Sequence, residues 1–210
     1  MAVFFKVGLV MQLAEGVGGF IQELIDSGNR VFLDYKYYDI DATLSSAVER
    51  AAKLGVSFLT IHGTTRLIRA AVKGKGDSGL KLFTVTVLTS MDKADLDELG
   101  YTHQTVEDLV LFRAKSALNA GCDGVIASAE EARQIKDISQ GKLLVVTPGI
   151  RPNGYPADDQ KRKATARDAI IAGADYLVVG RPIAKAQSPR AAAEGILMEM
   201  QDAIDEASKL

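Results

Sequence analysis

The chain has 210 residues, of which 47% are hydrophobic and 25% charged, as is ordinary for one globular domain. Its net charge of −2 gives no overall basic field for nucleic acid, so local cations and backbone amides must hold any anionic ligand. The single Cys122 excludes an intrachain disulfide and is typical of a reducing cytoplasm. No apolar run reaches the ~18 residues of a membrane span, and the separated His62 and His103 supply no His/Cys metal site.

The chain begins with an apolar run over residues 4–9 that predicts a β-strand, and one pattern then recurs along it. In this pattern an amphipathic helix ends at a glycine and a short β-branched run follows. The pattern occurs at Gly28 before residues 31–33, Gly55 before 56–59, Gly121 before 124–126 and Gly173 before 176–179. Glycine ends a helix because it enters the left-handed region without a Cβ penalty, and continuous apolar runs indicate strands buried on both faces.

Two further apolar runs, over residues 82–88 and 143–146, bring the count to about seven strand–helix units. The alternation predicts a single parallel α/β domain over residues 1–210, and we expect a (β/α)₈ barrel of the TIM type. A closed barrel needs eight units, one more than the sequence shows. A doubly wound open sheet tolerates seven strands, but its glycine-rich first turn is not found here.

Residues 74–79 (GKGDSG) match the G-x-G-x-x-G fingerprint of dinucleotide-binding folds. That fingerprint requires a strand before the glycines and a helix after them. Here a helical pattern precedes the glycines and an apolar run follows. We therefore expect a flexible surface connection rather than a dinucleotide site.

The charged residues of segment 31–40 form the first candidate site. Asp34 and Lys36 are two residues apart on a predicted strand, so their side chains project to the same side. At the carboxyl end of a barrel strand that side is the mouth, where active sites of this fold lie, and Asp39 follows at the start of the loop. The spacing alone is equally compatible with a structural ion pair. Lys6 favours a site, because a lysine among apolar residues of the preceding strand needs a carboxylate such as Asp34.

The second candidate site suits an anion. Residues 145–150 and 178–181 correspond to the ends of the seventh and eighth strands of a barrel, and the loops there commonly bind phosphate. Gly180 permits close approach of the backbone, and Arg181 offers a bidentate guanidinium. The polar segment 151–163, rich in Gly and Pro, is typical of a lid over such a site.

Together these segments resemble the bacterial orotidine 5′-phosphate decarboxylase family, in family order along the whole chain. The matching segments are residues 5–8 (FKVG), 33–40 (LDYKYYDI), 85–91 (VTVLTSM), 146–152 (VTPGIRP), 159–160 (DQ) and 179–183 (VGRPI). The D-x-K-x-x-D motif at 34–39 is shared with related sugar-phosphate barrels, but together with the two phosphate-loop motifs it is specific. The resemblance implies a cytoplasmic enzyme that decarboxylates orotidine 5′-phosphate to uridine 5′-phosphate, the last step of de novo pyrimidine synthesis, with no cofactor or metal.

The resemblance also implies a role for each matching residue. Lys6, Asp34 and Lys36 would form a charged array, with Lys36 the proton donor to C6 of the pyrimidine. Asp39 and Thr43 would complete the site of the neighbouring subunit in a homodimer. The other substrate-binding residues would be Ser90 at the pyrimidine, Pro148 in a phosphate loop, and Gln160, Gly180 and Arg181 at the phosphate. No family role matches His62, for which we expect a position in the core or behind the site.

The sequence departs from the family pattern in two places. Asp41 and Ala42 replace the usual Pro-Asn pair. Family members also open with an additional strand, which ends in an aspartate that holds the ribose hydroxyls, and with a helix; we find neither before residue 4. Two alternatives therefore stay open. One is a magnesium-dependent sugar-phosphate decarboxylase or aldolase on the same D-x-K-x-x-D frame, and the other is a non-catalytic nucleotide-binding barrel.

Overall fold

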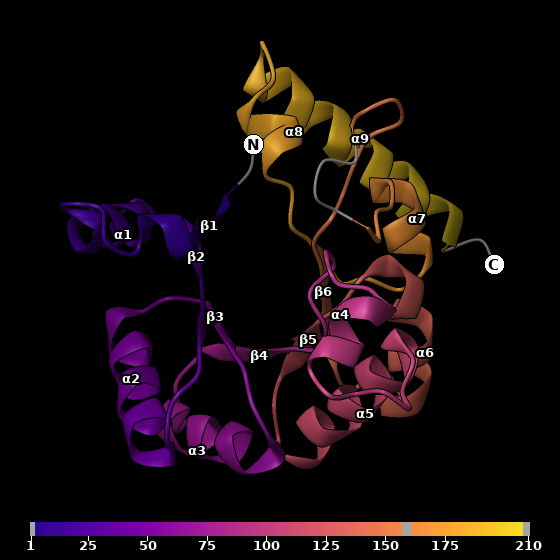
Figure 1. Cartoon of the computed structure of the whole chain (residues 1–210). Helices are drawn as coiled ribbons and strands as arrows, with labels where there is room; N and C mark the ends of the chain where they lie inside the picture. The colour runs from indigo at the N-terminus through magenta and orange to yellow at the C-terminus, as the bar shows by residue number, and fades with distance from the viewer. Residues whose placement is uncertain (1–2, 157–160, 208–210) are drawn as a thin grey trace. The chain divides into compact units, whose positions relative to one another are not determined.

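The computed structural model describes residues 3–156 and 161–207, and within them it contains the seven expected strands. The strands are β1 (Phe4–Gly8), β2 (Arg30–Tyr37), β3 (Phe58–Ile61), β4 (Lys81–Val85), β5 (Gly124–Ile126), β6 (Leu144–Thr147) and β7 (Tyr176–Leu177). The helices are η1 (Leu9–Met11), α1 (Val17–Asp26), α2 (Asp41–Leu54), α3 (Thr65–Lys75), α4 (Lys93–Glu98), α5 (Val106–Asn119), α6 (Ala129–Ser139), α7 (Ala166–Ile171), α8 (Arg181–Ala184) and α9 (Pro189–Ala207). Strands and helices alternate along most of the chain, as the sequence predicts (Figure 1).

The chain divides into two compact units, and each is described by itself. The N-terminal unit comprises Ala2–Val85 and Ser116–Gly124, and the C-terminal unit comprises Thr86–Lys115 and Val125–Leu210. The boundary therefore falls directly after β4, within α5 and at the start of β5. A single domain over residues 1–210 stays a prediction.

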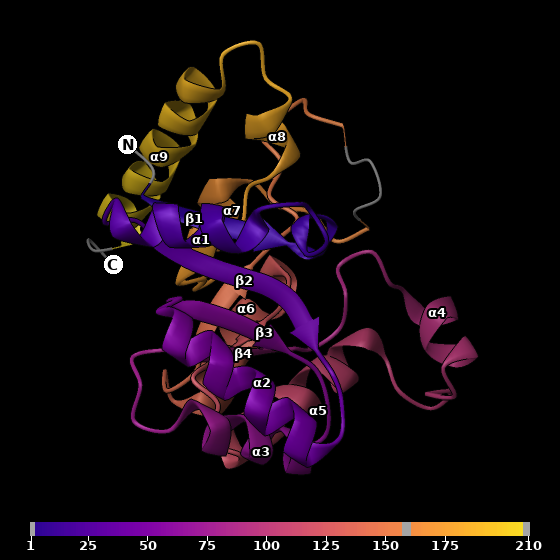
Figure 2. The same ribbon diagram turned by 90° about the vertical axis from the view of Figure 1, so that its left-hand side faces the viewer.

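The N-terminal unit is built on four parallel strands in the order β1-β2-β3-β4. The apolar residues of β2, β3 and β4 are buried, whereas in β1 only Val7 is buried and Phe5 is exposed. Phe58 at the start of β3 packs against Phe83 of β4 with ring centroids 4.5 Å apart. Helices α1, α2 and α3 lie on one face of these strands (Figures 1 and 2). Burial of large apolar side chains on continuous strands is the main stabilising term here, because each buried aliphatic or aromatic side chain contributes about 1.5–3 kcal/mol.

The four glycines predicted to end helices all adopt positive φ, between 78° at Gly28 and 102° at Gly173. Gly55 illustrates the reason. It follows the last residue of α2 with a φ of 83°, and its N–H donates to the carbonyl of Ala52. This left-handed step turns the chain out of the helix and into β3, which confirms the predicted pattern of helix, glycine and strand.

In its described residues, the C-terminal unit contains the last three strands, the first part of α5, and helices α4, α6, α7, α8 and α9. β6 and β7 pair in parallel, and the N–H of Ala127, just after β5, donates to the carbonyl of Val146 in β6 at 3.2 Å. A separate apolar cluster lies between α7 and α9, the helices drawn beside each other in Figure 1, and Leu177 of β7 packs against it. Its buried members are Ile150, Ala166, Ala169, Ala174 and Ile196. Within the described residues, no helix is long and apolar enough to cross a membrane.

The glycine-rich motif at residues 74–79 is only partly the surface connection that its sequence suggests. Gly74 lies inside α3, which ends at Lys75. A Cβ built on Gly74 would lie 2.2 Å from the carbonyl oxygen of Ser45 in α2, so glycine lets the two helices approach closely. A Cβ on Gly79, in the turn before β4, meets nothing within 4 Å. The first glycine of the motif therefore serves helix packing.

We expect the substitution Gly74→Ala to destabilise the protein by about 3 kcal/mol, because a rigid backbone carbonyl stands where the methyl group must go. Alanine gains about 1 kcal/mol in helix propensity, and the clash outweighs that gain. Urea unfolding measures the difference. Gly79→Ala is the matched control and should change the free energy of unfolding by less than about 0.5 kcal/mol. Equal stability of the two variants would contradict the close packing of α2 on α3.

Candidate active site

Strand β2 of the N-terminal unit contains a β-bulge where its charged residues lie. β2 pairs with β3 at Leu33 and again at Tyr37, so β2 advances four residues while β3 advances two. Thr60 in the middle of β3 therefore faces three residues of β2, the last of which is Lys36. Lys36 has a φ of 51°, in the left-handed region. A bulge re-aims side chains, and a non-glycine residue at positive φ is strained and must be held by its surroundings.

Three charged side chains meet at this bulge. Asp34 accepts a hydrogen bond from Lys6 Nζ at 2.9 Å and another from Lys36 Nζ at 2.8 Å. The first of these confirms the carboxylate partner predicted for a lysine inside an apolar strand. Asp34 is the most buried of the three, with 16% of its side chain exposed, against 31% for Lys6 and 35% for Lys36. Two ammonium groups around one carboxylate leave this charged array (Lys6, Asp34 and Lys36) with a net charge of +1.

The hydroxyl of Thr60, in the neighbouring strand β3, forms hydrogen bonds with two residues of the array. Thr60 Oγ1 accepts a hydrogen bond from the N–H of Lys36 at 2.9 Å and donates to Asp34 Oδ1 at 3.0 Å. One buried side chain thus fixes both the strained backbone of Lys36 and the carboxylate between the lysines. Thr60 is a residue of this site that the sequence patterns do not predict. Its sequence context offers one indication: Thr60 is the only hydroxyl residue in a short apolar strand, and that strand is buried along its whole length.

The environment of Asp34 keeps its carboxyl group ionised. Burial by itself raises the pKa, because it disfavours the charged form. The positive charge of Lys6 and the hydrogen bonds from Lys36 and Lys6 together outweigh burial, and the pKa of Asp34 lies below its ordinary value of 3.8. Asp34 is therefore a carboxylate at neutral pH.

Asp39 and Thr43 lie beyond the end of β2, on the surface of the unit. Both side chains are exposed, and the Asp39 carboxylate accepts a hydrogen bond from the N–H of Ile40 at 2.7 Å. Asp39 and Ile40 also line a surface hollow between the end of β2 and the start of α3. Beside Asp39, Tyr38 is 68% exposed and Ile40 is 71% exposed. The carboxylate predicted for a neighbouring subunit thus lies between two exposed apolar side chains.

The remaining predicted site residues belong to the C-terminal unit. Ser90 is half-buried in a turn that follows β4, and Pro148 is half-buried directly after β6. Gly180 precedes α8, and the half-buried Arg181 is the first residue of that helix. Gln160 lies outside the described residues. The two ends of the segment 151–163 lie close together, because the N–H of Arg151 donates a hydrogen bond to the carbonyl of Ala164 at 2.8 Å.

In the part of the chain that the structure describes, no group of three or more His, Cys, Asp or Glu side chains could hold a metal ion. His62 is half-buried just after β3, and its ring packs edge-on against Tyr38 with centroids 6.3 Å apart. The absence of a metal and of a cofactor stays a prediction, as does the role of His62.

Comparisons with known proteins agree on one family. The model of the Orotidine 5′-phosphate decarboxylase / HUMPS family matches residues 1–196. The chain belongs to this family. It is 54% identical to the orotidine 5′-phosphate decarboxylase of Nitrobacter winogradskyi over 201 residues, which cover 96% of this chain and 83% of that protein. It is 45% identical to the orotidine 5′-phosphate decarboxylase of Jannaschia sp. over 198 residues, 94% of this chain and 86% of that protein.

A solved structure of the family supports the fold class. The crystal structure of orotidine 5′-phosphate decarboxylase from Lactobacillus acidophilus matches with a TM-score of 0.80 and 35% identity, over 93% of this chain and 85% of that chain. The predicted α/β fold of the TIM-barrel type is therefore confirmed, with seven strands in the residues that the structure describes.

Proposed function

We propose that this chain is a carbon–carbon lyase that converts orotidine 5′-phosphate to uridine 5′-phosphate and carbon dioxide without a cofactor, in the last step of de novo pyrimidine synthesis. The charged array at the end of β2 carries this proposal, because it supplies electrostatics and a proton donor in one place. The names of the family relatives support the same reaction. The single buried cysteine supports a cytoplasmic location.

Loss of carbon dioxide breaks the bond from C6 of the pyrimidine to the carboxylate carbon, and the electron pair stays on C6. The developing carbanion has no electron sink of the kind that a cofactor provides. In our proposal, the Lys36 ammonium stabilises the negative charge and then gives its proton to C6, after which solvent reprotonates the amine. The hydrogen bonds from Lys36 Nζ to Asp34 and from Lys36 N–H to Thr60 support this role, because they fix both ends of the lysine.

Asp34 would lie near the departing carboxylate of the substrate. Two unit charges about 4 Å apart repel by ~4 kcal/mol at an effective dielectric constant of ~20, which corresponds to roughly a thousandfold in rate. The two lysines that contact Asp34 reduce this repulsion, since the array has a net positive charge. Repulsion in the ground state is therefore a minor contribution, and stabilisation of the carbanion by Lys36 is the major one.

Binding energy from the rest of the nucleotide completes the proposal. Ser90 would hydrogen-bond the pyrimidine, and Pro148 would lie near the phosphate. Gln160, Gly180 and Arg181 would bind the phosphate itself. The position of Arg181 as first residue of α8, directly after a glycine, supports a phosphate contact through both its guanidinium and nearby backbone. Phosphate binding far from C6 can stabilise the closed, reactive arrangement of the site.

A homodimer is part of this proposal. Asp39 is exposed between Tyr38 and Ile40, two exposed apolar side chains, and an interface that covers them would bury apolar area. A twofold axis there would place Asp39 and Thr43 of each subunit at the site of the other.

Absorbance of orotidine 5′-phosphate tests the function directly. We expect the 210-residue chain to consume this nucleotide and release one carbon dioxide per uridine 5′-phosphate, at a rate unchanged by EDTA. Turnover that requires added magnesium would favour the sugar-phosphate type of chemistry. Tight binding of uridine 5′-phosphate without turnover would identify a non-catalytic nucleotide-binding protein.

A further inference from the structure

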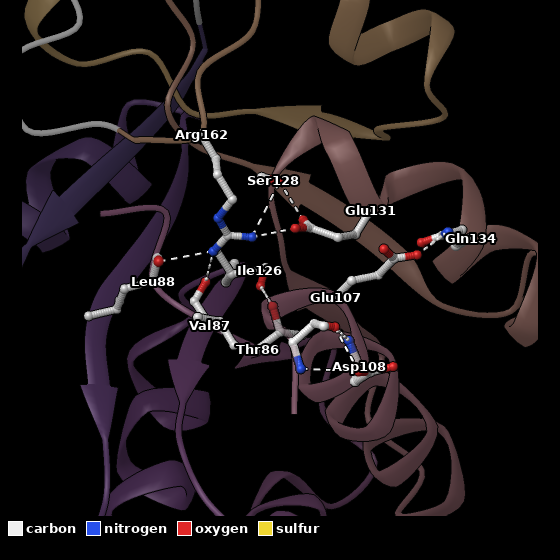
Figure 3. A network of polar contacts seen from close by, with 11 residues as sticks. Thr86, Val87, Leu88, Glu107, Asp108, Ile126, Ser128, Glu131, Gln134 and Arg162 are labelled. Carbon is white, nitrogen blue, oxygen red and sulfur yellow. Dashed lines mark hydrogen bonds and ion pairs between the residues drawn. The ribbon is translucent and has the colours of Figure 1, made fainter. Parts of the chain in front are cut away.

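A buried ion pair in the C-terminal unit lies next to the turn that carries Ser90. The guanidinium of Arg162 pairs with the carboxylate of Glu131 in α6, and the two side chains are only 9% and 5% exposed (Figure 3). The hydroxyl of Ser128 donates to Glu131 and lies 3.5 Å from Arg162 Nη1. One arm of the guanidinium is thereby fixed to the start of α6.

The other arm of the guanidinium binds the chain just before Ser90. Arg162 Nη2 donates to the carbonyl of Val87 at 3.1 Å and to the carbonyl of Leu88 at 3.0 Å (Figure 3). The next carbonyl, that of Thr89, accepts hydrogen bonds from the backbone N–H groups of Lys161 and Arg162, both at 3.2 Å. Three successive carbonyls that precede Ser90 are therefore all held by residues 161 and 162.

An ion pair in this position is poorly explained by stability alone. Removing two charges from water costs more than their attraction returns in many proteins, and apolar replacements of similar volume are often as stable. A planar guanidinium, however, can donate directional hydrogen bonds to two adjacent carbonyls, and an apolar side chain cannot. The feature that distinguishes Arg162 is thus the orientation it imposes on residues 87–89.

We infer that Arg162 is a positioning residue for recognition of the pyrimidine: it fixes the turn at residues 87–89 so that Ser90 meets the base in a single orientation. The inference rests on the proposed function, since Ser90 binds a pyrimidine only if the chain binds this nucleotide. Glu131 acts one step further away, because it orients the guanidinium. Neither residue needs to touch the substrate.

The test is a double-mutant cycle. It compares the affinity for uridine 5′-phosphate that is lost when Ser90 is replaced with the affinity that is lost when the ion pair is replaced. Arg162→Met is combined with Glu131→Leu, so that no unpaired carboxylate is left buried. The dissociation constant of uridine 5′-phosphate is measured by calorimetry for four proteins: wild type, Ser90→Ala, Arg162→Met/Glu131→Leu, and the variant with all three changes. Melting temperature shows that each variant folds.

We expect Ser90→Ala and Arg162→Met/Glu131→Leu each to weaken binding by about tenfold, the scale of one hydrogen bond. The variant with all three changes should be no more than about threefold weaker than either, because the ion pair acts through Ser90. Independent effects would multiply to about a hundredfold and overturn the inference. So would unchanged binding in either Ser90→Ala or Arg162→Met/Glu131→Leu.

The chain offers a matched control in the same unit. Lys136 of α6 pairs with Asp175 at 2.6 Å, and Asp175 accepts the N–H of Val145 near the start of β6, at the other end of that strand from Pro148. Lys136→Met with Asp175→Asn should lower the melting temperature but leave the dissociation constant unchanged. A wild-type chain that neither binds uridine 5′-phosphate nor consumes orotidine 5′-phosphate would instead overturn the proposed function itself.

Discussion

Replacement of Lys36 by alanine is expected to reduce decarboxylation of orotidine 5′-phosphate by roughly 10⁴-fold or more. The size of this rate reduction follows from two contributions of Lys36 Nζ that the substitution removes. Proton donation by a positioned group contributes about 10²–10⁴-fold, and a charge aimed at a developing anion contributes about 10²–10³-fold. Loss of substrate absorbance under saturating nucleotide measures the turnover number directly.

The fold should survive this substitution. Asp34 keeps its ion pair with Lys6 and its hydrogen bond from the Thr60 hydroxyl, so no carboxylate is left buried without a partner. We therefore expect a melting temperature within a few degrees of the wild type. Lys53→Ala is the matched control, because Lys53 is a 74% exposed lysine of the same unit that pairs with Glu49 across one helical turn. Turnover of Lys36→Ala within tenfold of the Lys53→Ala control would rule out Lys36 as the proton donor.

A mixture of two inactive variants should regain activity if the site is shared between subunits. In a homodimer with such shared sites, Lys36→Ala and Asp39→Ala would each disable both sites of their own dimer. Random exchange of subunits makes about half of the dimers mixed, and each mixed dimer has one site with an intact Lys36 and an intact Asp39. We expect the mixture to recover about a quarter of wild-type turnover, a rise of several hundredfold or more over either variant alone.

Subunit exchange must be shown independently, for example by energy transfer between differently labelled chains. Mixing Lys36→Ala with itself under the same conditions gives the background. If exchange is complete and turnover stays at background, Asp39 serves only its own chain. The exposed carboxylate beside Tyr38 and Ile40 would then need another explanation.

Much of the fold followed from local rules that need no tertiary information. Glycines at 28, 55, 121 and 173 end helices because their backbone can adopt positive φ, and each apolar run that follows them forms a strand. The first three of these strands are largely buried, whereas the two residues of β7 are only half-buried. The number of strands was also accessible, because each apolar run between helical patterns is a separate strand. By contrast, the glycine motif at residues 74–79 was read only as a connection, since sequence periodicity cannot show that the backbone of Ser45 passes beside Gly74.

The sequence by itself determined which residues of β1 and β2 carry charge, and the need of Lys6 for a carboxylate selected Asp34 correctly. Only the tertiary structure decided how these side chains meet. A regular strand would already place Asp34 and Lys36 on one side, but the bulge against β3, the positive φ of Lys36 and the hydroxyl of Thr60 arise from pairing between strands that are distant in sequence. Local sequence patterns likewise could not predict the role of Arg162, because its partners Val87, Leu88 and Glu131 lie 31 to 75 residues away along the chain. Hydrogen bonds at such separations depend on the packed backbone, and no spacing rule along the sequence encodes them.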